Sequence, residues 1–284
     1  MRPDWLFVDG SSLIFRAFYG VPQTVVAPDG RLVNAVRGFL DTLARLIYAR
    51  RPNLLSVASD EDWRPQWRVD LIPSYKSHRV AEPVPDPLEP QFPLIHELLA
   101  AVGVDFVGVP DYEAEDVIAT WTARAVGMRI EVVSGDRDLF ALVSDQIKVL
   151  YPERKGLAEV DDAELQRRYG VPGALYGDFA VLRGDPSDGL PGLPGVGPKT
   201  AAELVKRHGG VRGLIDSGRY SEAQRDYLER ALLAVLPVRD APVELPPGRR
   251  DAYPANPETA SELGRRYGVS SSVDRLVGAL QSKR

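Results

Sequence analysis

Two kinds of hydrophobic pattern alternate along the first half of the chain. Short apolar runs such as WLFVDG are typical of buried strands, whereas NAVRGFLDTLARLIYAR repeats apolar positions at helical spacing. Buried strands that alternate with helices predict an α/β fold with a mostly parallel central sheet and helices on both faces. The expected strands are 5–10, 54–60, 104–109, 128–136 and 147–150, and the expected helices are 11–20, 34–50, 93–103 and 113–126.

The pattern changes in the second half of the chain. From about residue 161 the strand pattern stops, and DDAELQRRYG, EAQRDYLERALLAVLPV and the last residues, 259–284, all have helical spacing. We therefore expect an α/β domain over residues 1–172 and a helical subdomain over residues 173–284. Within the first domain, residues 62–90 fit neither pattern and are rich in proline, aromatic and basic residues, which is typical of a functional or mobile connection.

Composition narrows the class of protein. The 284 residues are 44% hydrophobic and 26% charged, which allows a sizeable core and argues against wholesale disorder. Cysteine is absent from the sequence, so disulfides and thiolate zinc sites are excluded. The N-terminus has no signal-peptide pattern, and no run approaches the roughly 20 apolar residues of a membrane span. We expect a cytoplasmic protein.

Acidic residues recur where the predicted strands end and the predicted helices begin. The carboxyl ends of parallel strands are where such sheets carry their chemistry. Each acid alone is explained by helix capping or by a favourable place in a first helical turn. Together they would repel one another unless cations lay among them, so we treat the set as one candidate metal site. Its members are Asp9, Asp60, Glu113, Glu115, Asp116, Asp136, Asp138, Asp185 and Asp188.

This choice of ligands indicates a particular chemistry. Carboxylate oxygens without histidine or cysteine suit Mg²⁺ or Mn²⁺. Two such ions a few ångströms apart can activate a water and stabilise the leaving oxygen of a phosphodiester. The net charge of −5 argues weakly against a nucleic-acid partner. If metal ions neutralise the nine acids, however, the rest of the protein carries a charge of +4, which attracts DNA.

A glycine- and proline-rich stretch, GDPSDGLPGLPGVGPKTAAELV, leads directly into a helical pattern. Small residues let the backbone approach a ligand, and free amides at a helix start can hold a phosphate. This is the pattern of a helix–hairpin–helix over residues 184–206, which grips a duplex backbone without base recognition. The alternative is a stiff turn between two packed helices. The expected phosphate contacts are Gly195, Gly197, Lys199 and Thr200.

Several blocks, in the family's order, resemble the 5′-nuclease family of flap endonucleases, phage 5′-exonucleases and the nuclease domain of bacterial DNA polymerase I. VDGSSLIFRAFY carries Asp9 and Arg16, and IPSYKSHR carries Tyr75, Lys76 and Arg79. YEAEDV, SGDRDLF and GDPSDGLPGLPGVGPKTA match the remaining acidic blocks and the glycine-rich loop. The resemblance covers nearly the whole chain.

The resemblance implies a PIN-like nuclease fold with a helical arch over residues 62–90 and a helix–three-turn–helix in the C-terminal subdomain. It implies two-metal hydrolysis that leaves a 5′-phosphate, with Lys76 and Arg79 in contact with the scissile phosphate. Arg16 is an expected DNA contact, and the ring of Tyr75 would stack on an unpaired terminal base. The arch is expected to be mobile without DNA and to order around the strand.

The resemblance also bears on the ions and on one turn. A potassium ion is implied at the backbone carbonyls of residues 190–197. Most bacterial members carry asparagine after GDPSD, whereas this chain has Gly189, which we expect to loosen the turn. We assign the first metal to Asp9, Asp60 and Glu115, with help from Asp116, the second to Asp136, Asp138 and Asp188, and water-mediated roles to Glu113 and Asp185.

We therefore expect a structure-specific 5′ nuclease of replication and repair, both a 5′-flap endonuclease and a 5′-3′ exonuclease. Its expected partner is branched or flapped DNA in the bacterial cytoplasm, where it would associate with the nucleoid through that DNA. The chain ends without a polymerase portion, so it resembles a stand-alone member, and we expect a monomer. Two alternatives stay open: an RNase-H-like nuclease that removes RNA at 5′ ends, and a non-catalytic structure-specific DNA-binding protein.

Overall fold

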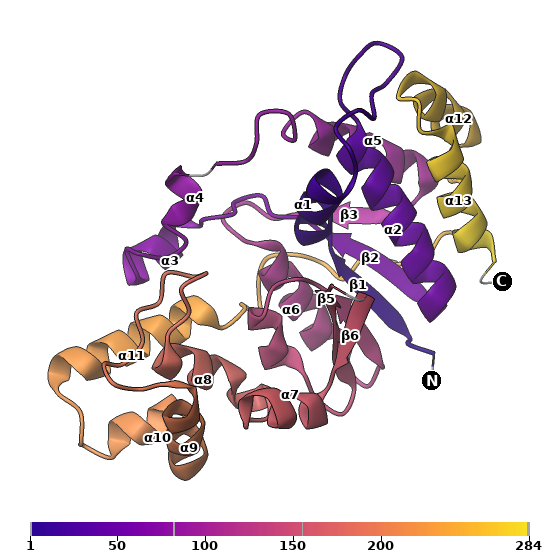
Figure 1. Cartoon of the computed structure of the whole chain (residues 1–284). Helices are drawn as coiled ribbons and strands as arrows, with labels where there is room; N and C mark the ends of the chain where they lie inside the picture. The colour runs from indigo at the N-terminus through magenta and orange to yellow at the C-terminus, as the bar shows by residue number, and fades with distance from the viewer. Residues whose placement is uncertain (1, 82, 155, 283–284) are drawn as a thin grey trace.

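A six-stranded sheet in the order β3-β2-β1-β4-β5-β6 forms the centre of the fold (Figure 1). The structure is a computed structural model and describes residues 2–81, 83–154 and 156–282. Strands β1 to β5 run parallel, and β6 pairs antiparallel with β5, so the predicted mostly parallel sheet is confirmed. The strands are β1 Trp5–Asp9, β2 Leu54–Ala58, β3 Asp105–Val107, β4 Ile130–Val133, β5 Ile147–Glu153 and β6 Gly156–Val160.

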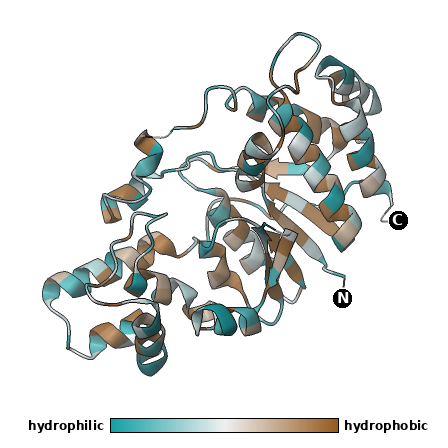
Figure 2. Ribbon diagram, viewed as in Figure 1, coloured by the Kyte–Doolittle hydropathy of each residue, from teal (hydrophilic) through white to brown (hydrophobic). Residues whose placement is uncertain are grey.

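Both faces of the sheet are covered, which explains why its strands are continuous apolar runs. Alternate residues of β1 enter two different cores: Trp5 and Phe7 pack on the side of α6, and Leu6 and Val8 on the side of α1 and α2. Figure 2 shows the strands as hydrophobic along most of their length. The covering helices are α1 Gly10–Gly20, α2 Asn34–Arg50, α5 Gln91–Val102 and α6 Ala114–Arg124, and α2 has the predicted bounds.

The segment predicted as an arch, residues 62–90, contains two short helices, α3 Gln66–Leu71 and α4 His78–Ala81. Its base is packed and does not stand free, because Arg68, Tyr75 and Lys76 are buried. Helix α3 lies against α11 Glu222–Val235, and Arg230 of α11 donates a hydrogen bond to the Leu71 carbonyl at 3.3 Å. The arch base therefore bridges the sheet and the helices that follow it.

A group of helices follows the sheet in the chain and lies at one end of the structure (Figure 1). Helices α8 and α9 are joined by the glycine-rich loop, and both pack near α10 and α11. The elements of this part are α7 Asp162–Tyr169, η2 Gly173–Leu175, α8 Tyr176–Arg183, α9 Pro198–His208, α10 Val211–Asp216 and α11 Glu222–Val235; the short helix η1 Asp138–Leu142 lies between β4 and β5. The predicted C-terminal helical subdomain is present over this range.

The last two helices lie elsewhere, which corrects the predicted extent of that subdomain. Helices α12 Pro257–Arg266 and α13 Ser270–Gln281 pack on α5 and α2, beside the sheet. Their buried residues, among them Leu263 and Leu276, belong to the core on the α1–α2 face. Local helical spacing could not distinguish these helices from α8 to α11. None of the helices in the described ranges combines the length and hydrophobicity that crossing a membrane requires.

Candidate metal centre and nucleic-acid cleft

The carboxylate at the end of β1 is fixed by its neighbours. Asp9 caps α1 by accepting a hydrogen bond from the Ser12 amide at 2.9 Å. Its second oxygen accepts from the Ser134 hydroxyl at 2.5 Å, and that hydroxyl accepts from the Asp136 amide at 2.9 Å. Burial, together with the charge of Asp60, raises the pKa of Asp9 to about 7. The ends of β1 and β4 are thus joined at one edge of the sheet.

Asp60 lies just beyond the end of β2 and connects this edge to α6. Its carboxylate accepts a hydrogen bond from the Ala114 amide at 2.7 Å, and its own amide donates to the Ser11 hydroxyl at 2.8 Å. Burial and the nearby Glu113 charge raise the pKa of Asp60 to about 6. The predicted convergence of strand-end acids is therefore present for β1, β2 and β4.

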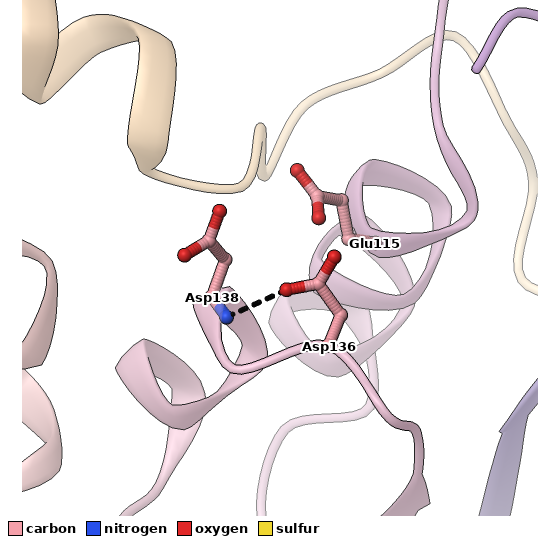
Figure 3. Close-up of side chains that lie close together, drawn as sticks. All are labelled: Glu115, Asp136 and Asp138. Atoms are coloured by element: carbon pink, nitrogen blue, oxygen red, sulfur yellow. Dashed lines mark hydrogen bonds between the residues drawn. The ribbon is translucent and has the colours of Figure 1, made fainter. Parts of the chain in front are cut away.

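The tightest group of carboxylates comprises Glu115 on α6 and two acids after β4. Figure 3 shows Glu115, Asp136 and Asp138 turned toward a common space, with one ligand oxygen from each within 4.8 Å of the others. The Asp138 amide donates to the Asp136 carboxylate at 2.9 Å, which sets the turn. Glu115, which was expected to bind the first metal, thus lies beside two acids expected to bind the second.

Two oxygens in this group are buried without a hydrogen-bond donor. Among the described residues, Glu115 Oε1 and Asp138 Oδ2 have no hydrogen-bond partner. Burial raises the pKa of both carboxyl groups well above the usual range; the charges of neighbouring acids add to the shift, and those of Lys76 and Arg68 oppose it. Orphaned carboxylate oxygens of this kind are what a divalent cation would satisfy. The observed donor set therefore fits Mg²⁺ or Mn²⁺.

Glu113 is surrounded by groups from the arch. It accepts hydrogen bonds from Lys76 Nζ at 2.7 Å, from the Tyr75 hydroxyl at 2.7 Å and from Arg79 at 3.1 Å, and it is paired with Arg68. Burial alone would raise the pKa of Glu113, but the charges of these cations outweigh it and lower the pKa to about 2. Glu113 is thus the acid through which the arch segment attaches to the site.

These contacts correct the expected role of Tyr75. Its side chain is fully buried and its hydroxyl is committed to Glu113. The ring packs under the Lys76 ammonium, which lies 5.0 Å from the ring centroid, and no face of it is open to a nucleotide base. The motif identified the residue, but the sequence could not show that its ring faces inward.

Lys76 is the cation closest to the centre of the acidic group. Its Nζ lies 4.0 Å from Asp136 and 3.9 Å from Asp188, in addition to the bond to Glu113. Its amide donates to the Asp188 carbonyl at 3.1 Å, which ties the arch to the glycine-rich loop. Burial raises the pKa of Asp188 to about 7 although the Lys76 charge opposes the shift.

Two of the nine predicted acids are satisfied by the protein itself. Asp116 accepts from Arg68 at 2.7 Å and from the Val238 amide at 2.8 Å, and it forms a capping box with Glu113. The carboxylate of Asp185 is bound by Arg137 at 3.0 Å and by Arg183 at 2.8 Å. Neither lines the cleft described below. Five of the other acids do line it, and two lie next to them: the five are Asp9, Asp60, Glu113, Glu115 and Asp136, and the two are Asp138 and Asp188.

A cleft of about 460 Å³ opens over the acids. Its walls come from α1 and from the arch, and they place aromatic and basic side chains opposite the carboxylates. Arg79 lies over the ring of Trp63 at 4.9 Å, and Trp63 in turn stacks on Phe15. The lining residues include Asp9, Phe15, Arg16, Asp60, Trp63, Lys76, Arg79, Glu113, Glu115 and Asp136.

Gly189 has a structural role that corrects the expectation of a looser turn. Its φ of +70° lies in the left-handed region, and an added Cβ would lie 1.9 Å from the Ser74 carbonyl oxygen. The Ser74 hydroxyl donates to the Gly189 carbonyl at 2.6 Å. Glycine is therefore what allows the loop and the arch to approach so closely.

The end of the glycine-rich loop is open. Gly195 and Gly197 have no atoms near the position of a Cβ, and Gly197 is the residue before α9. Lys199 and Thr200 are exposed in the first turn of that helix. Proline at the first position of α9 lacks an amide hydrogen, so the amides of the following residues are the available donors.

Sequence reasoning missed Arg68, the most buried cation of the site. Its side chain is 0% exposed and is paired with Glu113, Glu115 and Asp116. The residue lies on α3 within the segment 62–90, which the sequence marks as rich in basic residues. Only its complete burial, which local sequence does not reveal, distinguishes it from the half-buried Arg64 and Arg79 of the same segment.

Comparisons with known proteins agree with this geometry. The family described as 5′-3′ exonuclease, N-terminal resolvase-like domain, matches residues 4–170, and its C-terminal SAM fold matches residues 171–236. The chain belongs to the 5′-3′ exonuclease family. Membership makes it a metal-dependent nuclease, so the non-catalytic alternative is set aside.

Individual relatives of this exonuclease support the assignment. A 5′-3′ exonuclease of Mycobacterium tuberculosis is 47% identical over 99% of both chains. DNA polymerase I of the same organism is 39% identical over 87% of this chain, a match that takes in 28% of the polymerase. A bacteriophage T5 flap endonuclease, solved as a pseudo-enzyme–product complex with DNA and metal ions, has a TM-score of 0.66 at 16% identity and 98% coverage of both chains. That last likeness concerns the fold.

Proposed function

We propose that this exonuclease hydrolyses DNA phosphodiesters at the 5′ ends and flaps of branched DNA with two divalent metal ions. The observation that carries the proposal is the group Glu115, Asp136 and Asp138, which faces a common space and in which two buried oxygens accept no hydrogen bond. The family assignment supports the reaction, and the phage T5 relative described as bound to DNA and metal ions supports the ligands.

The residues fit the metals that this reaction requires. Glu115, Asp136 and Asp138 would hold one ion, and Asp9, Asp60 and Asp188 supply further carboxylates around it. All of these donors are oxygens, which favours Mg²⁺ or Mn²⁺ over softer metals. When bound, the ions would supply an activated water and a counter-charge for the leaving oxygen.

The basic residues of the cleft would bind the substrate. Lys76, Arg79 and Arg16 line its walls opposite the acids. A phosphate held between them and the metal centre would exchange the Lys76–Glu113 contact for a contact with its own oxygens. The rings of Phe15 and Trp63 lie in the same cleft, where they can stack on a base near the 5′ end.

The loop before α9 would hold the duplex. Its open backbone at Gly195 and Gly197, followed by Lys199 and Thr200, suits phosphate binding without base recognition. A potassium ion at the carbonyls of residues 190–197 would complete this grip. Because Asp188 in the same loop reaches the acidic group, the loop would fix the distance between the bound duplex and the phosphodiester that is hydrolysed.

One assay tests the proposal. A 5′-labelled flap duplex is incubated with Mg²⁺ or Mn²⁺, with and without EDTA, beside a matched flap with ribonucleotides at its 5′ end. We expect metal-dependent release of labelled product, and a loss of more than about 100-fold in Asp136→Asn with flap binding retained. Asp145→Asn, an exposed acid outside the cleft, is the control. Normal turnover by Asp136→Asn would overturn the metal assignment.

A further inference from the structure

Arg68 occupies an unusual position behind the metal centre. It projects from α3, at the base of the arch, and its side chain is 0% exposed. A guanidinium taken out of water costs several kcal/mol unless it is fully paired. It is not among the residues that line the cleft over the acids, so it is not placed to touch a substrate bound there.

Its partners are three carboxylates on the first turn of α6. One terminal nitrogen, Nη1, pairs with Glu113 and lies 2.8 Å from Glu115 Oε1. The other, Nη2, donates to Asp116 at 2.7 Å. The planar fork of arginine can span three acids in this way, whereas the point charge of lysine cannot.

Glu115 depends on this contact more than its neighbours do. Within the described ranges, Glu115 Oε1 has no hydrogen-bond donor, and the Arg68 charge is the cation nearest to it. Glu113 has Lys76 and Arg79 as further partners, and Asp116 has the Val238 amide. Without Arg68, the orientation of the Glu115 carboxylate would have no polar support on that side.

We propose that Arg68 is a positioning residue of the metal centre, which holds Glu115 turned toward Asp136 and Asp138. This inference rests on the proposed function, since it takes that group of acids as the metal site. The base of the arch would then contribute to metal binding through Arg68, and to substrate binding through Lys76 and Arg79.

A purely electrostatic role predicts the opposite sign. Removing a positive charge near a group of acids should tighten the binding of a divalent cation. Removing a residue that orients a ligand should weaken it, by about 10–100-fold for outer partners of metal ligands. Metal affinity therefore distinguishes the two roles, and it can be measured without turnover.

The experiment measures Mn²⁺ binding to the full chain from the electron paramagnetic resonance signal of free Mn²⁺, at one pH near neutrality. We expect the Mn²⁺ dissociation constant to rise about 10–100-fold in Arg68→Met and by a smaller factor in Arg68→Lys, which keeps the charge but not the fork. Arg50→Met is the matched control, because Arg50 pairs with Glu131 and Glu159 at the other end of the strands.

The outcomes separate the inference from the function on which it rests. Unchanged or tighter Mn²⁺ binding by a folded Arg68→Met protein would overturn the positioning role while the metal centre stands. If Arg68→Met does not fold, Arg68→Lys decides in the same way: weaker binding supports the inference and unchanged binding overturns it. A wild-type chain that binds no Mn²⁺ would remove the metal centre itself.

Discussion

The pKa values of individual carboxylates in this site are shifted in opposite directions. Asp9 and Asp188 are buried near other acids, which raises their pKa to about 7. Glu113 is equally buried, but its pKa falls to about 2 because Lys76 and Arg68 surround it. The protein thus surrounds Glu113 with counter-charges, whereas Asp9 and Asp188 keep raised pKa values among other acids.

This contrast predicts how a metal-free protein responds to pH. An acid whose pKa is higher in the folded than in the unfolded protein stabilises the fold when the pH lies below its unfolded-state pKa. This contribution is lost as the pH rises through the folded-state pKa, about 7 for Asp9. Calorimetry in EDTA should therefore give a lower Tm at about pH 8 than at about pH 5, with about 2–4 °C for each kcal/mol lost. Saturating Mn²⁺ should remove the difference.

A matched pair of variants checks which acids are responsible. Asp9→Asn should flatten the dependence of Tm on pH in EDTA, because the neutral amide cannot ionise. Asp29→Asn, at an exposed acid far from the site, should leave the dependence as it is in the wild type. Equal slopes in Asp9→Asn and wild type would contradict the assignment.

At the scale of elements, the contact between the arch base and the glycine-rich loop holds the site together. The Lys76 amide and the Ser74 hydroxyl both bond to backbone carbonyls of the loop. This approach is possible because Gly189 has no side chain. The loop thus sets where the Lys76 ammonium lies among the acids.

Two glycines with nearly the same backbone conformation test this contact. Gly189 has φ +70° beside the Ser74 carbonyl, whereas Gly218 has φ +69° with open space around it. Gly218→Ala should cost only about 1–2 kcal/mol, for the left-handed backbone. Gly189→Ala should cost clearly more in urea denaturation and should reduce flap cleavage. Equal losses of stability in the two variants would argue against the close approach.

Sequence patterns predicted the strands and helices well where the hydrophobic pattern of a segment reflects how that segment is buried. The runs that became β1 and β2 are apolar because both faces of the sheet are covered, and α2 has an uninterrupted amphipathic repeat. Strand β6 was missed because it is a mostly exposed edge strand without a hydrophobic signature. The inward side chains of Arg68 and Tyr75, and the return of α12 and α13 to the sheet, depend on long-range contacts that no local pattern records.

At the scale of the whole molecule, the acidic edge of the sheet and the proposed duplex grip, the start of α9 from Gly195 to Thr200, are separate surfaces joined by the loop after α8. Figure 1 shows the helices α8 to α11 at one end, with α3 and α4 of the arch segment above α11 on the same side of the sheet. A substrate that contacts both must bend or branch between them, which suits flapped DNA.

The proposed duplex grip predicts how the affinity for DNA depends on salt concentration. Lys199→Ala should weaken binding to all duplex sequences alike and reduce the slope of log affinity against log salt by about 1. Lys148→Ala is the control, since Lys148 lies at the opposite end of the strands and pairs with Glu159. Fluorescence anisotropy at several salt concentrations measures both. A loss confined to particular sequences would contradict a grip on the phosphate backbone.

The return of α12 and α13 to the sheet has a consequence for biosynthesis. Helix α2 leaves the ribosome early, but part of its apolar surface is covered by α13, which is translated long after it. Until then the nascent chain carries an uncovered hydrophobic stripe of the kind that chaperones bind. Completion of this exonuclease's first domain therefore waits for α13 to emerge, although the candidate metal ligands are translated long before it.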